Sequence, residues 1–287
     1  MNPTPALAGF ALLLAALGGA PGARCDELVQ VAPHRAAAGL AGSEGTPPLL
    51  GYLARPDGPG RFPAVVLLHG CSGFTPHDTE AAWTLRSWSY VGLALDSLGS
   101  ANVCAGGGGA GAEARDAYAA LRYLGAQGFV AADRVAVMGY SMGGAAALIA
   151  VEKSALQAFA REGSEGAGPA GFRAMVGYYP PCAFSSGVLT APALVLVGER
   201  DDWTPAAACR KLAAHESDLG TTRDAAAGTP VDLVVYPDAT HAFDFRLPSR
   251  RRLLGHLIQY DEAAARDAEA RVRAFLRRTL GEHAESP

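Results

Sequence analysis

The sequence predicts a doubly wound α/β fold, in which a mostly parallel eight-stranded sheet is covered by helices on both faces. Short apolar runs alternate along the chain with longer stretches of helical pattern. From Ala64 onward the runs are almost continuously apolar, as is typical of parallel strands that are buried on both faces. The chain has 287 residues, of which 49% are hydrophobic, so it can bury one large core.

Strands and helices are assigned in order from these runs, with glycine, proline and polar clusters marking the loops between them. Strands are expected at residues 27–31, 49–54, 64–68, 91–95, 135–138, 174–178, 193–197 and 231–236. Helices are expected at residues 79–88, 112–127, 143–151, 205–215 and 261–280. In the last of these, Val272, Phe275 and Leu276 recur at helical spacing among charged residues, which indicates an amphipathic helix on one face of the sheet.

A motif of the form G-x-S-x-G lies at residues 139–143, directly after the apolar run 135–138 and before an alanine-rich helix. This order is typical of a nucleophile elbow, where the serine occupies a strained turn and glycines leave room for the chain to reverse. The motif therefore indicates a hydrolase with Ser141 as its nucleophile.

A serine hydroxyl needs a base within hydrogen-bond reach and an acid that orients the base. Two loops that follow predicted strands supply candidates: Asp201 and Asp202 lie after the strand at 193–197, and His241 lies after the strand at 231–236. The carboxyl ends of parallel strands meet at one edge of a sheet, so these side chains can converge on Ser141. Their order along the chain is that of α/β-hydrolases.

Four segments together carry a resemblance to a known family: 67–73 (Leu-Leu-His-Gly-Cys-Ser-Gly), 139–144, 198–205 and 236–243. On these segments the chain resembles the dienelactone hydrolase family of α/β-hydrolases, over residues 27 to 280. Many members of that family carry cysteine in the elbow, whereas this chain has Ser141. It is most similar to the exported relatives that carry serine.

The resemblance implies a role for each site residue. Ser141 is the expected nucleophile and His241 the general base, and Asp201 matches the acid of the pattern G-x-x-D-x-x-x-P. Asp202 is the alternative acid; otherwise it is a helix-capping or surface carboxylate. The backbone N–H groups of Met142 and Cys71 are the expected oxyanion donors.

The start of the chain is expected to be a secretory signal peptide over residues 1–25, which leaves a single domain over 26–287. Residues 6–20 are continuously apolar, but they are too few to span a bilayer, which takes about 20 apolar residues. No Lys or Arg precedes this run, so a disordered or mis-assigned start is the alternative. We expect an exported protein, periplasmic or secreted, that does not associate with a membrane once the leader is removed.

Export makes disulfides plausible among the cysteines. We favour the pairs Cys71–Cys104 and Cys182–Cys209, because each would join loops that are expected to be neighbours. Buried free thiols are the alternative. Cys25 lies beside the expected cleavage region.

Several other classes of function are disfavoured. The net charge is −4 and the longest basic run is residues 250–252, which disfavours nucleic acid as a partner. The glycines at 106–109 lack the Lys and Ser/Thr of a phosphate-binding loop, and no cysteine or histidine spacing resembles a zinc site. His69 is expected to hold the oxyanion loop rather than act as a base. Tyr140, Tyr179, Trp203, Phe243 and Phe245 either line the pocket or belong to the core.

The function predicted from the sequence is a carboxylic ester hydrolase that uses no cofactor and no metal. It would act on a small-molecule ester or lactone through an acyl-enzyme on Ser141. A peptidase or thioesterase with the same triad, or a non-catalytic binding protein on the same scaffold, are the alternatives.

Overall fold

The computed structural model describes residues 26–33, 47–97, 109–159, 171–216 and 229–281, and the expected mostly parallel eight-stranded sheet is confirmed in them. The strands lie in the order β1-β2-β4-β3-β5-β6-β7-β8. Their bounds are β1 (Asp26–Val31), β2 (Leu49–Ala54), β3 (Phe62–Leu68), β4 (Val91–Asp96), β5 (Val130–Tyr140), β6 (Ala174–Tyr178), β7 (Ala193–Gly198) and β8 (Val231–Tyr236).

The strands from β4 to β8 in this order run parallel, whereas β1 and β2 form an antiparallel extension beside β4. β3 lies near the centre and pairs with both β4 and β5, and every residue of β3 is buried. This explains its unbroken apolar sequence, because both faces of a central parallel strand are covered by helices.

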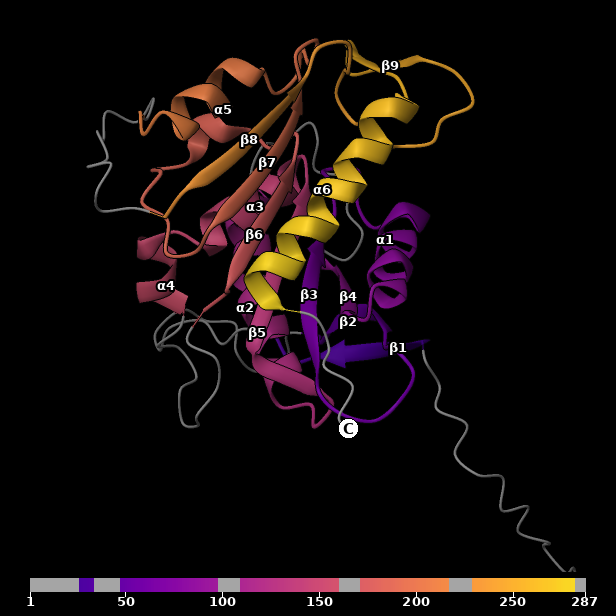
Figure 1. Cartoon of the computed structure of the whole chain (residues 1–287), viewed down its shortest axis with the longest axis vertical. Helices are drawn as coiled ribbons and strands as arrows, with labels where there is room; N and C mark the ends of the chain where they lie inside the picture. The colour runs from indigo at the N-terminus through magenta and orange to yellow at the C-terminus, as the bar shows by residue number, and fades with distance from the viewer. Residues whose placement is uncertain (1–25, 34–46, 98–108, 160–170, 217–228, 282–287) are drawn as a thin grey trace, which may run out of the picture.

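Helices cover both faces of the sheet, as expected. They are α1 (Pro76–Ser87), α2 (Ala110–Gly125), α3 (Met142–Ala150), α4 (Lys153–Phe159), α5 (Ala206–Ala213) and α6 (Glu262–Leu280). Figure 1 shows α6 in front of the sheet and α3 behind it. The buried stripe of α6, which includes Val272, Phe275 and Leu276, packs towards β5, β6 and β7, so the expected amphipathic helix is confirmed.

Some elements differ from the expectation. α1 begins at Pro76 rather than at residue 79, because Thr75 and Asp78 form a capping box around a proline at the first turn. α4, the 3-10 turn η2 (Cys182–Phe184) and a hairpin of β9 (Arg251–Leu253) and β10 (His256–Ile258) were not expected. These elements are short, so their own sequences carry little periodicity.

Other expectations fall on residues outside the described ranges. The leader at 1–25, Cys25, Cys104 and the glycines at 106–108 are among them. Across the ranges given above, no helix combines the length and the apolar composition that crossing a membrane requires.

Candidate active site

Ser141 stands at the carboxyl end of β5, on a sharp turn into α3. Its backbone angles are φ 54° and ψ −113°, in the left-handed half of conformational space that side chains rarely adopt. Its N–H donates to the carbonyl of Tyr178, at 2.9 Å, on the neighbouring strand. A Cβ atom added to Gly139 would lie 2.0 Å from the carbonyl oxygen of Gly143, so this turn requires glycine at position 139.

His241 connects Ser141 to Asp201. The loop after β8 places His241 Nε2 3.0 Å from the Oγ atom of Ser141, and His241 Nδ1 2.8 Å from Oδ2 of Asp201. The structure therefore brings together the three side chains that the sequence placed in three separate loops. The side chains of Asp201 and His241 are almost completely buried, at 0% and 3% exposure.

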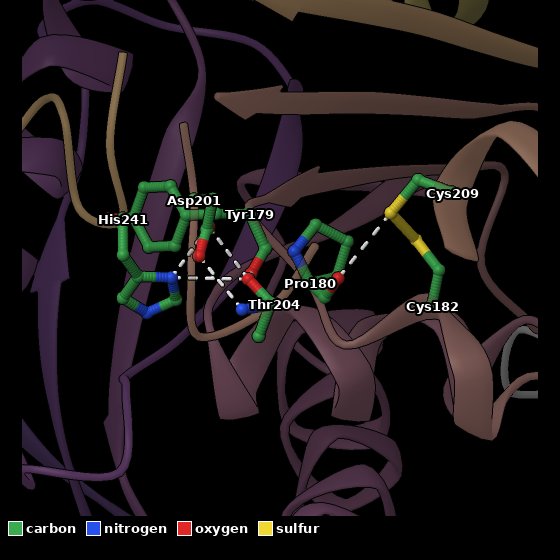
Figure 2. Close-up of a disulfide and its surroundings, with 7 residues drawn as sticks. All are labelled: Tyr179, Pro180, Cys182, Asp201, Thr204, Cys209 and His241. Atoms are coloured by element: carbon green, nitrogen blue, oxygen red, sulfur yellow. Dashed lines mark hydrogen bonds and ion pairs between the residues drawn. A yellow bond between two sulfur atoms is a disulfide. The ribbon is translucent and has the colours of Figure 1, made fainter. Parts of the chain in front are cut away.

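Four hydrogen bonds hold the carboxylate of Asp201, and Figure 2 draws those that involve Thr204 and His241. Its Oδ1 accepts from the N–H groups of Trp203 and Thr204, at 2.9 and 2.8 Å, and its Oδ2 faces Thr204 Oγ1 and His241 Nδ1. Burial alone would raise the pKa of Asp201. The interactions with His241 and Thr204 outweigh burial and hold this pKa below its usual range. The carboxylate is thus fixed in its charged form.

Thr204 is a site residue that the sequence reasoning missed. Its Oγ1 lies 2.8 Å from Asp201 Oδ2, 3.1 Å from His241 Nδ1 and 3.0 Å from the carbonyl oxygen of Tyr179. Figure 2 shows this hydroxyl between the acid, the imidazole and the end of β6. The sequence indicates at most the turn, because an Asp side chain commonly bonds the backbone two residues further on, and no local pattern indicates that the hydroxyl of Thr204 meets His241.

Asp202 lies away from the imidazole of His241. Its side chain is 49% exposed, and its Oδ1 lies 3.4 Å from Nδ1 of His256 and accepts from the N–H of Leu257 at 3.3 Å. These contacts join the loop after β7 to the β9–β10 hairpin. The alternative acid therefore does not meet His241 in the structure.

The two expected oxyanion donors flank Ser141. Met142 is the first residue of α3, where a backbone N–H has no partner within the helix. Cys71 lies in a turn closed by a hydrogen bond from Gly73 N–H to the Gly70 carbonyl at 3.1 Å, and a Cβ atom on Gly70 would be 3.9 Å from that of Ser141. The turn at residues 70–73 therefore lies beside the nucleophile elbow, and the assignment of the two N–H groups as oxyanion donors stays a prediction.

A cavity of about 330 Å³ opens onto Ser141 and His241. Its walls are largely apolar and come from the 70–73 turn, the loop after β8 and the β9–β10 hairpin. Tyr140, Tyr179, Trp203 and Phe245 line it, and the rings of Tyr179 and Trp203 lie 4.7 and 5.0 Å from the imidazole of His241. Phe243 is instead completely buried in the core.

His77, which lines this cavity, forms a polar pair with Asp244. Nε2 of His77 lies 3.2 Å from Oδ2 of Asp244, whose other oxygen accepts from the hydroxyl of Tyr179 at 2.7 Å. Burial would lower the pKa of His77, but the charge and hydrogen bond of Asp244, together with the charges of Asp78 and Glu80, outweigh burial and raise this pKa above its usual value. Asp244 therefore links two residues that line the cavity, His77 and Tyr179.

The cysteines follow the favoured pairing as far as the structure describes them. Cys182 and Cys209 form a disulfide that joins η2 to α5, close to the loop of Asp201 and Thr204 (Figure 2). Cys71 is also disulfide-bonded. Its predicted partner, Cys104, lies outside the described residues, so that pairing stays a prediction.

Two further expectations concern His69 and metal ligands. The ring of His69 is buried and contacts the carbonyl oxygens of Gly70 and Ser97, as expected for a residue that holds the loop. Within the part of the chain that the structure describes, no group of three or more His, Cys, Asp or Glu side chains is placed to hold a metal ion.

Comparison with known proteins identifies the family. The profile of the dienelactone hydrolase family matches residues 109–280. A Bradyrhizobium protein named "Probable 2-oxo-3-(5-oxofuran-2-ylidene)propanoate lactonase" is 27% identical over 232 residues, which cover 68% of this chain and 78% of that protein.

Solved structures show the same fold. Thermogutta terrifontis esterase 2 with propionate bound superposes with a TM-score of 0.65 at 18% identity, over 93% of this chain and 98% of that one. A dienelactone hydrolase-like promiscuous phosphotriesterase from metagenomic libraries gives 0.59 at 21% identity, over 90% and 100%. The chain belongs to the dienelactone hydrolase family and is a carboxylic ester hydrolase.

Proposed function

We propose that this hydrolase cleaves esters or lactones through an acyl-enzyme on Ser141, with His241 as general base and Asp201 as the acid that orients it. The observation that carries the proposal is the continuous hydrogen-bonded chain from Ser141 Oγ through both nitrogens of His241 to Asp201 Oδ2, at 3.0 and 2.8 Å. In this chain Nδ1–H donates to the carboxylate, so Nε2 is left free to accept the serine proton.

The mechanism follows from this arrangement. Ser141 Oγ attacks the carbonyl carbon while its proton passes to His241 Nε2, and the negative oxygen that forms faces the N–H groups of Met142 and Cys71. His241 then gives the proton to the leaving alkoxide, which departs as an alcohol. Water, deprotonated by His241, attacks the acyl-enzyme; the bond from the acyl carbon to Ser141 Oγ breaks, the acid is released, and His241 returns the proton to Ser141 Oγ. In a lactone, the alcohol and the acid remain parts of one product.

The size and lining of the cavity support a small substrate. A volume of about 330 Å³ is at the lower end of the range for small-molecule sites, and its aromatic and aliphatic walls favour an apolar acyl or alcohol group. The names of the relatives agree with this substrate class: one is a lactonase, and another was solved with propionate bound.

We also propose that the protein works outside the cytoplasm. The Cys182–Cys209 disulfide supports this, because disulfides form and persist in oxidising compartments.

The test of the proposal is Ser141→Ala, assayed on p-nitrophenyl acetate and butyrate beside a thioester and a peptide of matched acyl group. We expect the ester activity to fall by about 10⁴-fold or more, with the thermal unfolding curve retained. The unaltered protein should turn over the esters faster than the thioester and the peptide. Full activity in Ser141→Ala would refute the assigned nucleophile.

A further inference from the structure

A second cavity, of about 610 Å³, adjoins the active-site cavity at Ser141 and takes no part in the mechanism above. Residues of α1 and α6 supply its two sides, and the carboxyl ends of β5 and β6 supply its base (Figure 1). His77 and Tyr140 line both cavities, and Tyr140 directly precedes Ser141 in the chain. A ligand in the second cavity would therefore lie next to the nucleophile elbow.

Two tyrosine hydroxyls of the second cavity form no hydrogen bond within the part of the chain that the structure describes. They belong to Tyr140 and Tyr178, which both line the cavity and are each only 6% exposed. Burial raises the pKa of both hydroxyls well above its usual value, and the charges of Asp244 and Glu269, which line the same cavity, raise it further. Both hydroxyls thus stay protonated, and each offers an O–H donor to a molecule in the cavity.

Charged side chains of both signs complete the lining of the second cavity. Glu80 on α1 and Glu269 on α6 form no ion pair within the described ranges, so their carboxylates are available as acceptors. Arg246 likewise has no carboxylate partner among the described residues, and it adds a charged donor. Arg266 and Glu262 also line the cavity but bond to each other at 2.6 Å. The cavity therefore offers donors and acceptors together.

This mixed lining favours a neutral ligand that is rich in hydroxyl groups. An ammonium group needs acceptors only and a carboxylate needs donors only, so either would face groups of its own polarity in this cavity. A hydroxyl both donates and accepts, so several hydroxyls on one ring can satisfy the tyrosines and the carboxylates together. Trp83, which lines the cavity and is 53% exposed, adds a flat aromatic surface for the C–H face of such a ring. A sugar combines these features.

We propose that the second cavity binds the sugar part of an acylated carbohydrate, whose acyl group occupies the smaller, largely apolar cavity at Ser141. This inference rests on the proposed function and names the substrate class of the same site. The reaction is the hydrolysis described above. The bond between the acyl carbon and the sugar oxygen breaks, and His241 gives the proton to that oxygen, so the sugar leaves as an alcohol.

Two acetates of primary alcohols test the proposal, because they share the acyl group and differ in the alcohol. They are ethyl acetate and methyl 6-O-acetyl-glucoside, and the release of acetic acid from each is followed in a pH-stat. We expect kcat/KM to be at least about 10-fold higher for the sugar ester, because each additional hydrogen bond contributes a factor of several. A ratio of one or less in the parent protein would overturn the inference.

Variants of the second cavity should lower this ratio. We expect Tyr178→Phe and Glu269→Gln each to lower the ratio of the two kcat/KM values by about 3- to 10-fold, since each removes one polar partner of the sugar. Both esters are measured on one preparation, so the fraction of folded protein cancels. Tyr236→Phe is the matched control, because the hydroxyl of Tyr236 bonds to Asp267 and neither residue lines the cavity. An unchanged ratio in both cavity variants, or an equal fall in Tyr236→Phe, would overturn the inference.

Binding without catalysis separates this inference from the proposed function. Methyl glucoside has no ester, and saturation-transfer NMR should show that it binds to the parent protein and binds more weakly to Trp83→Ala. No binding, binding unchanged in Trp83→Ala, or displacement of the glucoside by an equal concentration of choline or acetate would overturn the inference. If the glucoside binds but neither acetate is hydrolysed, the proposed function fails instead, so the two failures are distinguishable.

Discussion

Replacing Asp201 by Asn exchanges one carboxylate oxygen for an NH₂ group and should leave His241 unable to act as general base. In the parent, Oδ1 accepts from two backbone N–H groups and Oδ2 accepts from His241. If the amide NH₂ group of Asn took the place of Oδ1, its N–H bonds would point at two backbone N–H groups that need an acceptor. We therefore expect the NH₂ group in the place of Oδ2. There it donates to Nδ1 of His241, which forces the proton of the ring onto Nε2.

An imidazole with its proton on Nε2 cannot accept the proton of Ser141. In a serine protease the same exchange lowers kcat by about 10⁴, equivalent to about 5.5 kcal/mol of transition-state stabilisation, and we expect a loss of about 10³–10⁴ for Asp201→Asn. The assay is kcat on p-nitrophenyl butyrate, with thermal unfolding as the check on folding.

The neighbouring residue provides the matched control. Asp202→Asn makes the same chemical change at a half-exposed side chain that contacts His256 and Leu257, so its kcat should stay within about threefold of the parent. A loss in Asp202→Asn with activity retained in Asp201→Asn would refute the assignment and show that the loop rearranges in solution.

Two further predictions concern stability. The Cys182–Cys209 disulfide closes a sequence separation of 27 residues, so replacing both cysteines by Ala should cost about 3–4 kcal/mol and lower Tm by about 5–10 °C; an unchanged Tm in calorimetry would contradict this. The folded pKa of Asp201 is lower than its unfolded value, so the stability it contributes is present above the unfolded pKa of about 3.9 and is lost as pH falls through the folded pKa. The difference in unfolding free energy between the parent and Asp201→Asn, measured in urea, should therefore be level from pH 7 to 5 and shrink towards pH 3, and a difference that grows on acidification would contradict it.

Most of the sheet could be predicted from the sequence because its central strands are buried on both faces. Short, continuously apolar runs such as those of β3, β6 and β7 are typical of strands buried on both faces. The observed bounds of these strands agree with the expected bounds to within about two residues. The β9–β10 hairpin was missed, because its strands have three residues each and every residue of β9 is exposed. It is held by contacts from distant loops, such as that of Asp202 with Leu257 N–H, which no local pattern displays.

The residues of the site likewise divide into those that a local motif marks and those that only contacts in the folded chain identify. Ser141 and His241 are marked by motifs at strand ends, whereas the choice between Asp201 and Asp202 depends on which carboxylate the loop turns inward. Thr204 was not singled out, because its role arises from groups of other elements that meet it only in the folded chain. Sequence patterns show where the backbone brings residues together, and packing decides which of them face each other.

Covalent labelling tests the central claim most directly. The parent protein should react with one equivalent of a fluorophosphonate, lose its esterase activity in proportion, and carry the adduct on the peptide that contains Ser141. An adduct on another residue, or full activity after Ser141 has been completely labelled, would contradict the account.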